Sequence, residues 1–369
     1  MTERFARMTE GFHTRMTERF SRTIEGSMTP VGDLSGAVLN HRLKWDSDFA
    51  SLMHLTEMFQ TCEAGLPFSV EILPPNRGLG LSNIHEFFRG LDGWKPAFVS
   101  VTYHRAHRVE VQGEHGPEWV WNRKNPGALG VCAMLKFQYG LNVMPHVICG
   151  GFSKFDSEDY LVELDYLGLK HVLALRGDAD KNDPHFVPHP QGYAHANQLV
   201  EHIVRLNHGD YLEGVNDARP TDFSIGVAGY PEVHAEASDM ASDVANLKRK
   251  VDAGASFIIT QMFFDNAAFF RFVDACREAG IDVPIVPGIK VLTSKRQLEV
   301  LPAIFHTVMP PSLVEAVKAC SSDEEVVEVG LNHAETQTRE LLASGVPGIH
   351  FFTMNNSRVF NQLIHRMRG

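Results

Sequence analysis

The stretch Asn246–Asp265, NLKRKVDAGASFIITQMFFD, carries the pattern that decides the fold. Its first half has apolar residues at the spacing of a helix, and Gly254 then breaks that spacing. The second half is an almost unbroken apolar run, which is typical of a parallel strand covered on both faces. The stretch therefore predicts a helix followed by a strand that is buried between two layers.

The same alternation of helix and strand continues on both sides of this stretch. Asp265 to Ala279 has apolar residues at helical spacing and stops before Gly280, a residue type that commonly ends helices. Eight strands with helical crossovers predict an α/β fold of the (β/α)8 TIM barrel class, with a doubly wound open sheet as the alternative. The predicted strands are Phe68–Pro75, Phe98–His104, Asn142–Gly150, His171–Asp178, Phe223–Glu232, Phe257–Asp265, Val283–Ile289 and Gly348–Asn355.

Two polar segments interrupt this alternation. Residues 105–125 carry Trp119 and Trp121 and predict a loop or a hairpin on the barrel rim. Residues 184–193 contain three prolines and predict a second loop. The histidines in and beside this loop do not show the spacing of metal ligands, so we predict no metal site.

The first part of the chain differs from the rest. MTERF occurs at Met1–Phe5 and again at Met16–Phe20, with MTEGF between them. We interpret residues 1–45 as a flexible or helical extension and residues 46–369 as a single barrel domain that carries the catalytic site. Acidic residues among the arginines disfavour a targeting peptide, and translation from Met28 is an alternative. We assign the extension no function.

The overall composition limits the kinds of partner. A net charge of −11 disfavours binding to nucleic acid, which usually requires a basic excess. The chain has no apolar run long enough to cross a membrane, so we expect no membrane partner. Five scattered cysteines without a CxxC pair favour reduced thiols in a cytoplasmic protein over disulfides or a zinc site.

Polar residues gather where the predicted strands end. These residues are Glu71, Thr102-Tyr103-His104, His146, Arg176-Gly177-Asp178, Tyr230 to His234, and Gln261. Each has an ordinary structural explanation by itself, such as a turn or an ion pair. Together they lie at the end where barrels carry out chemistry, and burying each without a partner costs about 1–3 kcal/mol. The pattern therefore predicts a large polar ligand at this end.

The segment after the fifth predicted strand adds to this prediction. Ala237, Met240, Val244, Leu247 and Val251 form its buried stripe at helical spacing. Asp239, Asp243, Asn246 and Lys250 form a separate polar stripe, which is either a solvated face or a grip for ribose and pyrophosphate. The sequence has neither a GxGxxG motif nor a phosphate-binding P-loop, so a nucleotide cofactor would lie along the barrel rim.

Several of these motifs, in order along the chain, resemble the methylenetetrahydrofolate reductase family. The resemblance runs from Phe68 to about Met354, and PIVPGI at Pro284–Ile289 and the opening stretch belong to it. The other motifs are SVEILPP at Ser69–Pro75, FVSVTY at Phe98–Tyr103, LALRGD at Leu173–Asp178 and VAGYPEVHAEA at Val227–Ala237.

The resemblance assigns expected roles to individual residues. Glu71 matches the general acid, and Asp178 matches a carboxylate near the flavin and the pterin. Contacts to FAD are implied for Thr102, Tyr103, His146, Arg176, Gly177, Asp178, Tyr230, His234, Asp243, Asn246, Arg249 and Lys250. Contacts to the folate substrate are implied for Glu71, Gln261, Gln297, Leu301 and Arg358.

Two positions in this set depart from the family pattern. Leu301 stands where some members have an aromatic residue that covers the substrate. Asn356 stands where an arginine often meets the glutamate of the folate, with Arg358 two positions further on.

The resemblance also implies the reaction. A reduced nicotinamide, NADH or NADPH, passes hydride through FAD to 5,10-methylenetetrahydrofolate in a ping-pong cycle, and 5-methyltetrahydrofolate supplies methyl groups for methionine synthesis. We expect a homo-oligomer, and we expect neither a carboxyl-terminal regulatory domain nor inhibition by S-adenosylmethionine. The alternatives are another FAD barrel, such as a proline dehydrogenase, and a folate- or flavin-binding subunit that depends on a partner for electrons.

Overall fold

The computed structural model describes residues 55–60, 62, 66–114, 116–179, 183 and 185–368. The predicted extension, residues 1–45, and its boundary with the barrel domain lie outside these residues. Most of the loop predicted at residues 184–193 lies inside them and has no helix or strand.

Eight parallel strands close into a barrel in the order β1-β10-β9-β8-β7-β6-β5-β2. The closed ring confirms the predicted TIM barrel and shows that the open-sheet alternative is wrong. Every predicted strand contains one of the eight: β1 Phe68–Ile72, β2 Val99–Val101, β5 Val143–Ile148, β6 His171–Leu175, β7 Ser224–Gly229, β8 Phe257–Met262, β9 Ile285–Ile289 and β10 Ile349–Phe352.

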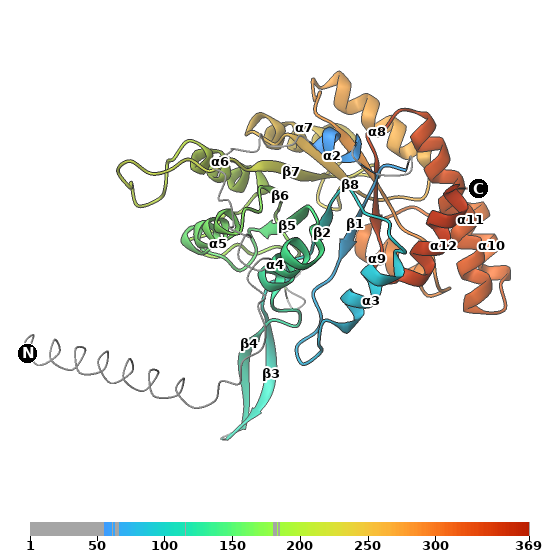
Figure 1. The fold of residues 1–369 in the computed structure, drawn as a ribbon, viewed down its shortest axis with the longest axis horizontal. Helices are drawn as coiled ribbons and strands as arrows, with labels where there is room; N and C mark the ends of the chain where they lie inside the picture. Colours follow the sequence, from blue (N-terminus) through green and yellow to red (C-terminus); the bar gives the residue numbers. More distant parts are fainter. Residues whose placement is uncertain are drawn as a thin grey trace, which may run out of the picture. The chain divides into compact units, whose positions relative to one another are not determined.

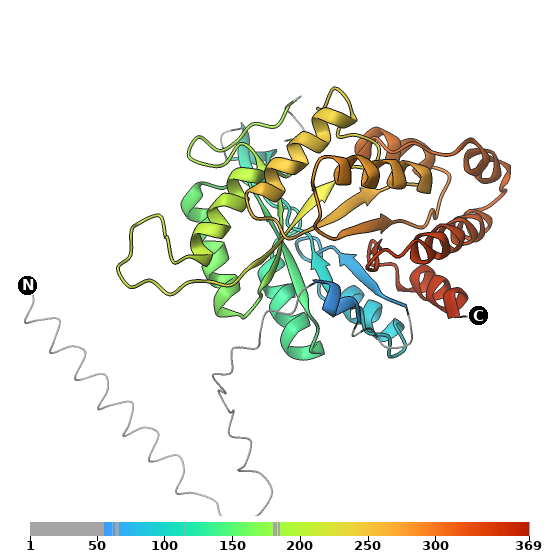
Figure 2. The same ribbon diagram turned by 90° about the horizontal axis from the view of Figure 1, so that it is seen from above.

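Most of the helices lie outside this ring, as Figures 1 and 2 show. They cover the outward face of the strands, where residues such as Val227 on β7 and Ile258 on β8 pack in the main hydrophobic core. The helices are α2 Leu55–Gln60, α3 Ser82–Gly90, α4 Ala128–Tyr139, α5 Lys154–Tyr166, α6 Ala196–Asn207, α7 Met240–Asp252, α8 Asn266–Glu278, α9 Gln297–Phe305, α10 Pro311–Ala319, α11 Asp323–Ala343 and α12 Ser357–Arg368.

Helix α2 contributes to the barrel interior. Its Leu55, Met58 and Phe59 belong to one buried cluster with inward residues of the strands, including Phe98 and Phe257. A side chain at Gly348, just before β10, would collide with the Phe59 ring. This cluster fills the interior with apolar side chains and leaves the polar inward residues of the same strands nearer their carboxyl ends.

The segment predicted as a loop or a hairpin is a hairpin, which leaves the barrel between β2 and α4. Strands β3 His107–Gly113 and β4 Gly116–Asn122 pair in antiparallel register, and Figure 1 shows them projecting from the ring of strands. Trp119 and Trp121 are 56% and 64% exposed on it, and the Arg108 guanidinium lies 5.5 Å from the centre of the Trp119 ring.

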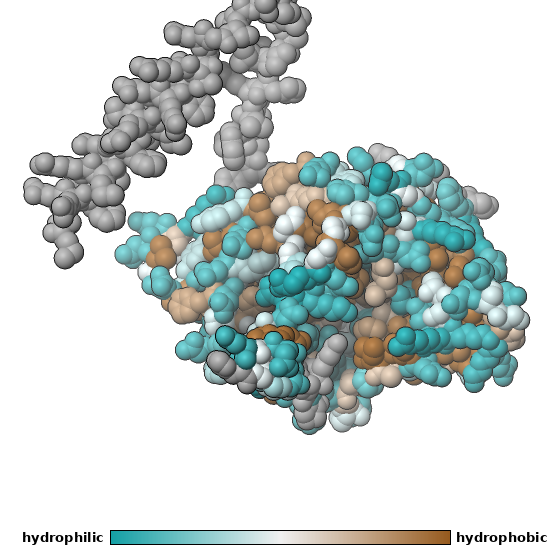
Figure 3. Space-filling model, turned by 90° about the horizontal axis from the view of Figure 1, so that it is seen from below, coloured by the Kyte–Doolittle hydropathy of each residue, from teal (hydrophilic) through white to brown (hydrophobic). Residues whose placement is uncertain are grey.

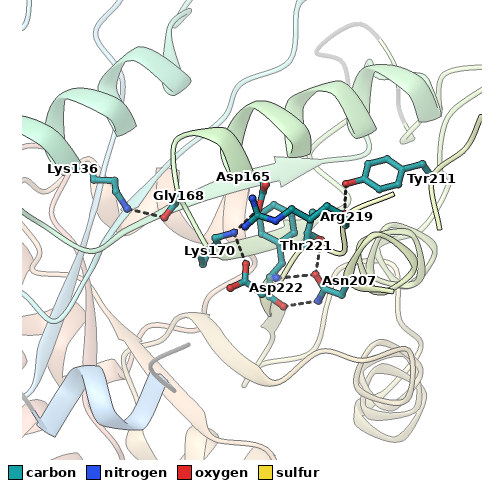
Figure 4. A network of polar contacts seen from close by, with 10 residues as sticks. Lys136, Asp165, Gly168, Lys170, Asn207, Tyr211, Arg219, Thr221 and Asp222 are labelled. Carbon is teal, nitrogen blue, oxygen red and sulfur yellow. Dashed lines mark hydrogen bonds and ion pairs between the residues drawn. The ribbon is translucent and has the colours of Figure 1, made fainter. Parts of the chain in front are cut away.

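A polar network ties together the amino-terminal ends of β6 and β7 (Figure 4). Lys170, directly before β6, binds the carboxylates of Asp165 and Asp222. The Asn207 side chain at the end of α6 bonds both the Thr221 hydroxyl and the backbone of Phe223. These contacts lie at the end of the barrel opposite to the strand ends that carry the predicted site.

The described surface mixes polar and apolar side chains. On the face drawn in Figure 3, apolar residues lie in several separate groups between polar ones. Of the helices that the structure describes, none has the length and apolar character to cross a membrane.

Candidate active site

The carboxyl ends of the eight strands form one mouth of the barrel, and most of the predicted site residues lie there. All strands of the barrel run in the same direction, so their carboxyl ends must lie at the same end of the molecule. Glu71 is on β1, His146 on β5 and Gln261 on β8, while Thr102, Arg176 and Tyr230 directly follow β2, β6 and β7. Six separate segments of the chain therefore contribute to one end of the molecule.

Glu71 and His146 meet inside this mouth. The distance from Glu71 Oε2 to His146 Nε2 is 3.6 Å, and the two side chains are only 14% and 7% exposed. Burial raises the pKa of Glu71 to about 8, an effect opposed by the charge of Lys290. Burial, with the charge of His104, lowers the pKa of His146 to about 3. At neutral pH both groups are therefore uncharged, and Glu71 holds a proton that it can donate.

Below Glu71 and His146, a buried histidine and two serines form a hydrogen-bonded layer inside the barrel. His350 on β10 is fully buried, and its two ring nitrogens lie 2.8 Å from Ser69 Oγ and 3.3 Å from Ser100 Oγ. Burial lowers the pKa of His350 to about 3, so this ring is neutral as well. Because Ser69 stands two residues before Glu71 on β1, both side chains point inward.

Lys290 is a functional candidate that the sequence reasoning missed. It directly follows β9 and is only 6% exposed. Burial lowers its pKa to about 8, and the charge of Glu71 opposes that effect. The sequence carried a signal for this position. Alternate residues of a strand share one face, so Lys290 lies on the same inward face as Val286 and Gly288.

Several buried polar atoms around the mouth have no hydrogen-bond partner among the residues that the structure describes. They are Thr102 Oγ1, His104 Nδ1, Arg105 Nε and Nη1, and His146 Nε2. Such atoms are costly to bury, and they mark where a ligand would complete the hydrogen bonding. Donors and acceptors together suit the ring edge and phosphates of a flavin nucleotide, so these residues fit FAD.

The segment after β6 turns sharply at Gly177. Its φ of +84° favours glycine, and a side chain there would touch Ile148 on β5. The turn leaves Asp178 exposed, and its charge acts on both His104 and Tyr230. Arg176 is bound by both carboxylate oxygens of Glu236, a partner that the sequence did not reveal.

The segment after β7 is fastened to the start of α7. The backbone nitrogen of His234 donates to Asp243, which is buried, and the Tyr230 and His234 rings lie 4.6 Å apart between centres. Val233 adopts a φ of +71°, which is unfavourable for a β-branched residue and shows that the surrounding contacts hold this turn. Burial raises the pKa of Tyr230 to about 12.

The other residues of α7 that were predicted to contact FAD differ in burial: Lys250 is half-buried, and Asn246 and Arg249 are exposed. Lys250 donates to the carbonyl oxygen of Ala228 on β7, and burial lowers its pKa to about 8. The exposed Asn246 and Arg249 bond to each other. Arg249 also lines a surface groove between α6 and α7.

The predicted substrate residues are also dispersed. Gln261 is half-buried and accepts from the Met262 backbone, while Gln297 begins α9 and accepts from Thr293. Leu301 is 5% exposed within a cluster of apolar side chains, so it offers little surface to a ligand. Arg358 is exposed in the first turn of α12.

Among the described residues, no group of three or more His, Cys, Asp or Glu side chains is arranged to hold a metal ion.

Comparison with known proteins agrees with this geometry. The chain is 32% identical over 314 residues to methylenetetrahydrofolate reductase (NADH) 1 of Arabidopsis thaliana, covering 82% of this chain and 47% of the relative. It is 31% identical over 316 residues to 5,10-methylenetetrahydrofolate reductase of Escherichia coli (strain K12), covering 85% of this chain and 94% of the relative. The chain thus spans about half the length of the plant relative and nearly all of the bacterial one. A family model for methylenetetrahydrofolate reductase matches residues 57–368, and the chain belongs to that family.

Proposed function

We propose that this protein reduces 5,10-methylenetetrahydrofolate to 5-methyltetrahydrofolate, with a reduced nicotinamide as the electron source and FAD as the bound cofactor. NADH is the nicotinamide that we favour, because the name of the plant relative specifies it. The product would supply methyl groups for methionine synthesis.

One observation carries the proposal: the Glu71 carboxyl group is buried at the mouth of the barrel, 3.6 Å from His146 Nε2, and this burial raises its pKa to about 8. Opening the five-membered ring of the substrate requires protonation of a ring nitrogen, and a general acid works best when its pKa lies near the working pH. The family match supports the assignment of the substrate.

The side chains around Glu71 have separate proposed tasks. When bound, FAD would supply the ring that takes hydride from the nicotinamide and passes it on to the folate. Thr102 and His146 would hold the cofactor with their unpartnered buried atoms, and Arg176 and Lys250 would face its phosphates. Glu71 would hold the proton and give it to the substrate nitrogen, while Gln261 would orient the substrate.

The decisive experiment separates the two half-reactions of the Glu71→Gln variant. The purified, FAD-loaded variant should still be bleached by NADH under anaerobic conditions. Its reoxidation by methylenetetrahydrofolate should slow by about 100-fold or more, the usual contribution of a general acid. The Glu86→Gln variant changes an exposed glutamate on α3 and should match the wild type. Reoxidation at the wild-type rate would remove Glu71 from the acid role.

The competing functions predict different colour changes. A proline dehydrogenase would be bleached by proline and would not respond to the folate. A subunit that depends on a partner would bind FAD and oxidise no NADH by itself. A homo-oligomer stays a prediction, which light scattering of the purified protein can check.

A further inference from the structure

We propose that Lys290 is a positioning residue for Glu71: its ammonium group, held inside the barrel, acts electrostatically on the Glu71 carboxyl group and sets the pH range of proton donation. The inference rests on the proposed function of Glu71 and adds a residue to that site.

The register of three adjacent strands places Lys290 level with Glu71. β10 lies between β1 and β9, and Glu71 on β1 pairs with Phe352 on β10. On the other side of β10, His350 pairs with Gly288 and Phe351 with Ile289. Continued by one residue, this register sets Lys290 beside Phe352. Glu71 and Lys290 thus flank Phe352, on strands about 10 Å apart.

The direction of the side chain follows from alternation along β9. Ile285 and Ile289 belong to the outer core beneath the helices, whereas Val286 belongs to the cluster inside the barrel. A side chain at Gly288 would meet the Phe352 ring. Lys290, two residues after Gly288, therefore points to the inside of the barrel, as does Glu71.

The ammonium group has no direct partner in the described part of the chain. No hydrogen bond or ion pair reaches Lys290 there, although the residue is only 6% exposed. Glu71 is the acidic group whose charge, once its proton is lost, acts on Lys290.

The other ionisable groups around Glu71 do not replace this charge. His146 on β5 and His350 on β10 are neutral, because burial lowers the pKa of each to about 3. Burial also lowers the pKa of His104 after β2, and the Asp178 carboxylate after β6 acts on His104 and Tyr230. Lys290 is the cation whose charge lowers the pKa of Glu71. Because Lys290 and Glu71 are only 6% and 14% exposed, water screens their attraction less than it would at the surface.

The test measures protonation of Glu71 directly, without turnover. Infrared titration of the purified full chain follows the C=O band of the protonated carboxyl group, and the band missing from Glu71→Gln identifies it. In Lys290→Met and Lys290→Gln, the midpoint should move up by about one pH unit or more, because the opposing charge is lost. Lys290→Arg keeps the charge and should keep the midpoint, as should Lys295→Met, an exposed lysine nearby.

The half-reaction with methylenetetrahydrofolate gives a second readout. Loss of rate at high pH should move upward in Lys290→Met by the same interval, since Glu71 then stays protonated longer. An unchanged infrared midpoint in both neutral variants would overturn the proposal, even if Glu71 is essential. A shifted midpoint in a protein that never reduces the folate would instead support the action of Lys290 on Glu71 and refute the proposed function.

Discussion

At the scale of single residues, burial at the barrel mouth keeps ionisable side chains uncharged at a pH where they would be charged in water. Glu71 is the main example, because burial raises its pKa from 4.5 to about 8. Its neighbour His146 offers no positive charge, since burial keeps that ring neutral. The buried position of Glu71 suits proton transfer but lowers the stability of the folded protein, as is common for active-site residues.

This conflict makes the stability contribution of Glu71 depend on pH. Below about pH 4.5 the carboxyl group is protonated in both the folded and the unfolded chain, so folding carries no penalty from it. Between about pH 4.5 and 8 the unfolded chain loses the proton and the folded chain keeps it, so stability falls as pH rises. The slope is at most about 1.4 kcal/mol per pH unit.

Glu71→Gln removes the ionisation, so its free energy of unfolding relative to the wild type should rise steadily from pH 5 to pH 8. Urea unfolding at several pH values measures this difference. The exposed Glu86→Gln control should show no such trend. A pH-independent difference for Glu71→Gln would contradict the raised pKa.

Asp178 acts at the same scale and through charge. It is exposed at the turn after β6, where its charge reaches His104 and Tyr230. If it also faces the flavin and the pterin, Asp178→Asn should slow flavin reduction by NADH and weaken folate binding, each by about 10-fold, equivalent to 1.4 kcal/mol. Stopped-flow measurement of both half-reactions tests this. A variant with two wild-type half-reactions would exclude Asp178 from the site.

At the scale of elements, the described part of helix α2 is anchored by its packing inside the barrel, where its buried side chains join those of the strands. Met58 is fully buried and Phe59 is 3% exposed. The helix thereby completes the apolar part of the interior.

Met58→Ala should therefore lower the free energy of unfolding by about 2–5 kcal/mol, the usual cost of a large-to-small change in a core. Gln60→Ala, on the exposed side of the same helix, should change it by less than about 0.5 kcal/mol. Chemical unfolding of the two variants provides the comparison. Equal stabilities would mean that α2 does not contribute to the core.

At the scale of the whole molecule, the two ends of the barrel have different tasks. The carboxyl-terminal end holds the candidate site, and the other end holds the Lys170 network of Figure 4. Lys170→Met leaves Asp165 and Asp222 without their shared cation. We expect a loss of about 1–2 kcal/mol in unfolding free energy, between the values for surface and buried ion pairs.

The same variant should keep the wild-type rate of flavin reduction by NADH, because the network is remote from the mouth. Lys248→Met breaks an exposed pair with Asp252 on α7 and should cost at most about 0.5 kcal/mol. Thermal unfolding and stopped-flow absorbance measure the two properties. A slower half-reaction in Lys170→Met would show that the two ends are coupled.

The sequence by itself determined the class of fold and the end of the molecule where the candidate residues gather. Both follow from local patterns: apolar runs specify strands covered on both faces, and parallel strands bring their carboxyl ends to one mouth. The hairpin between β2 and α4 was also predictable, because its polar segment interrupts the alternation of strand and helix.

Only the tertiary structure decided which partner each side chain meets, since those partners are distant in the sequence. Glu236 binds Arg176 from another loop, Lys290 comes level with Glu71 across β10 through the strand register, and Leu301 packs in an apolar cluster. Asn246 and Arg249 are exposed on α7 and bond to each other. A sequence pattern states which face a residue occupies, but contact, burial and pKa depend on the elements that pack against that face.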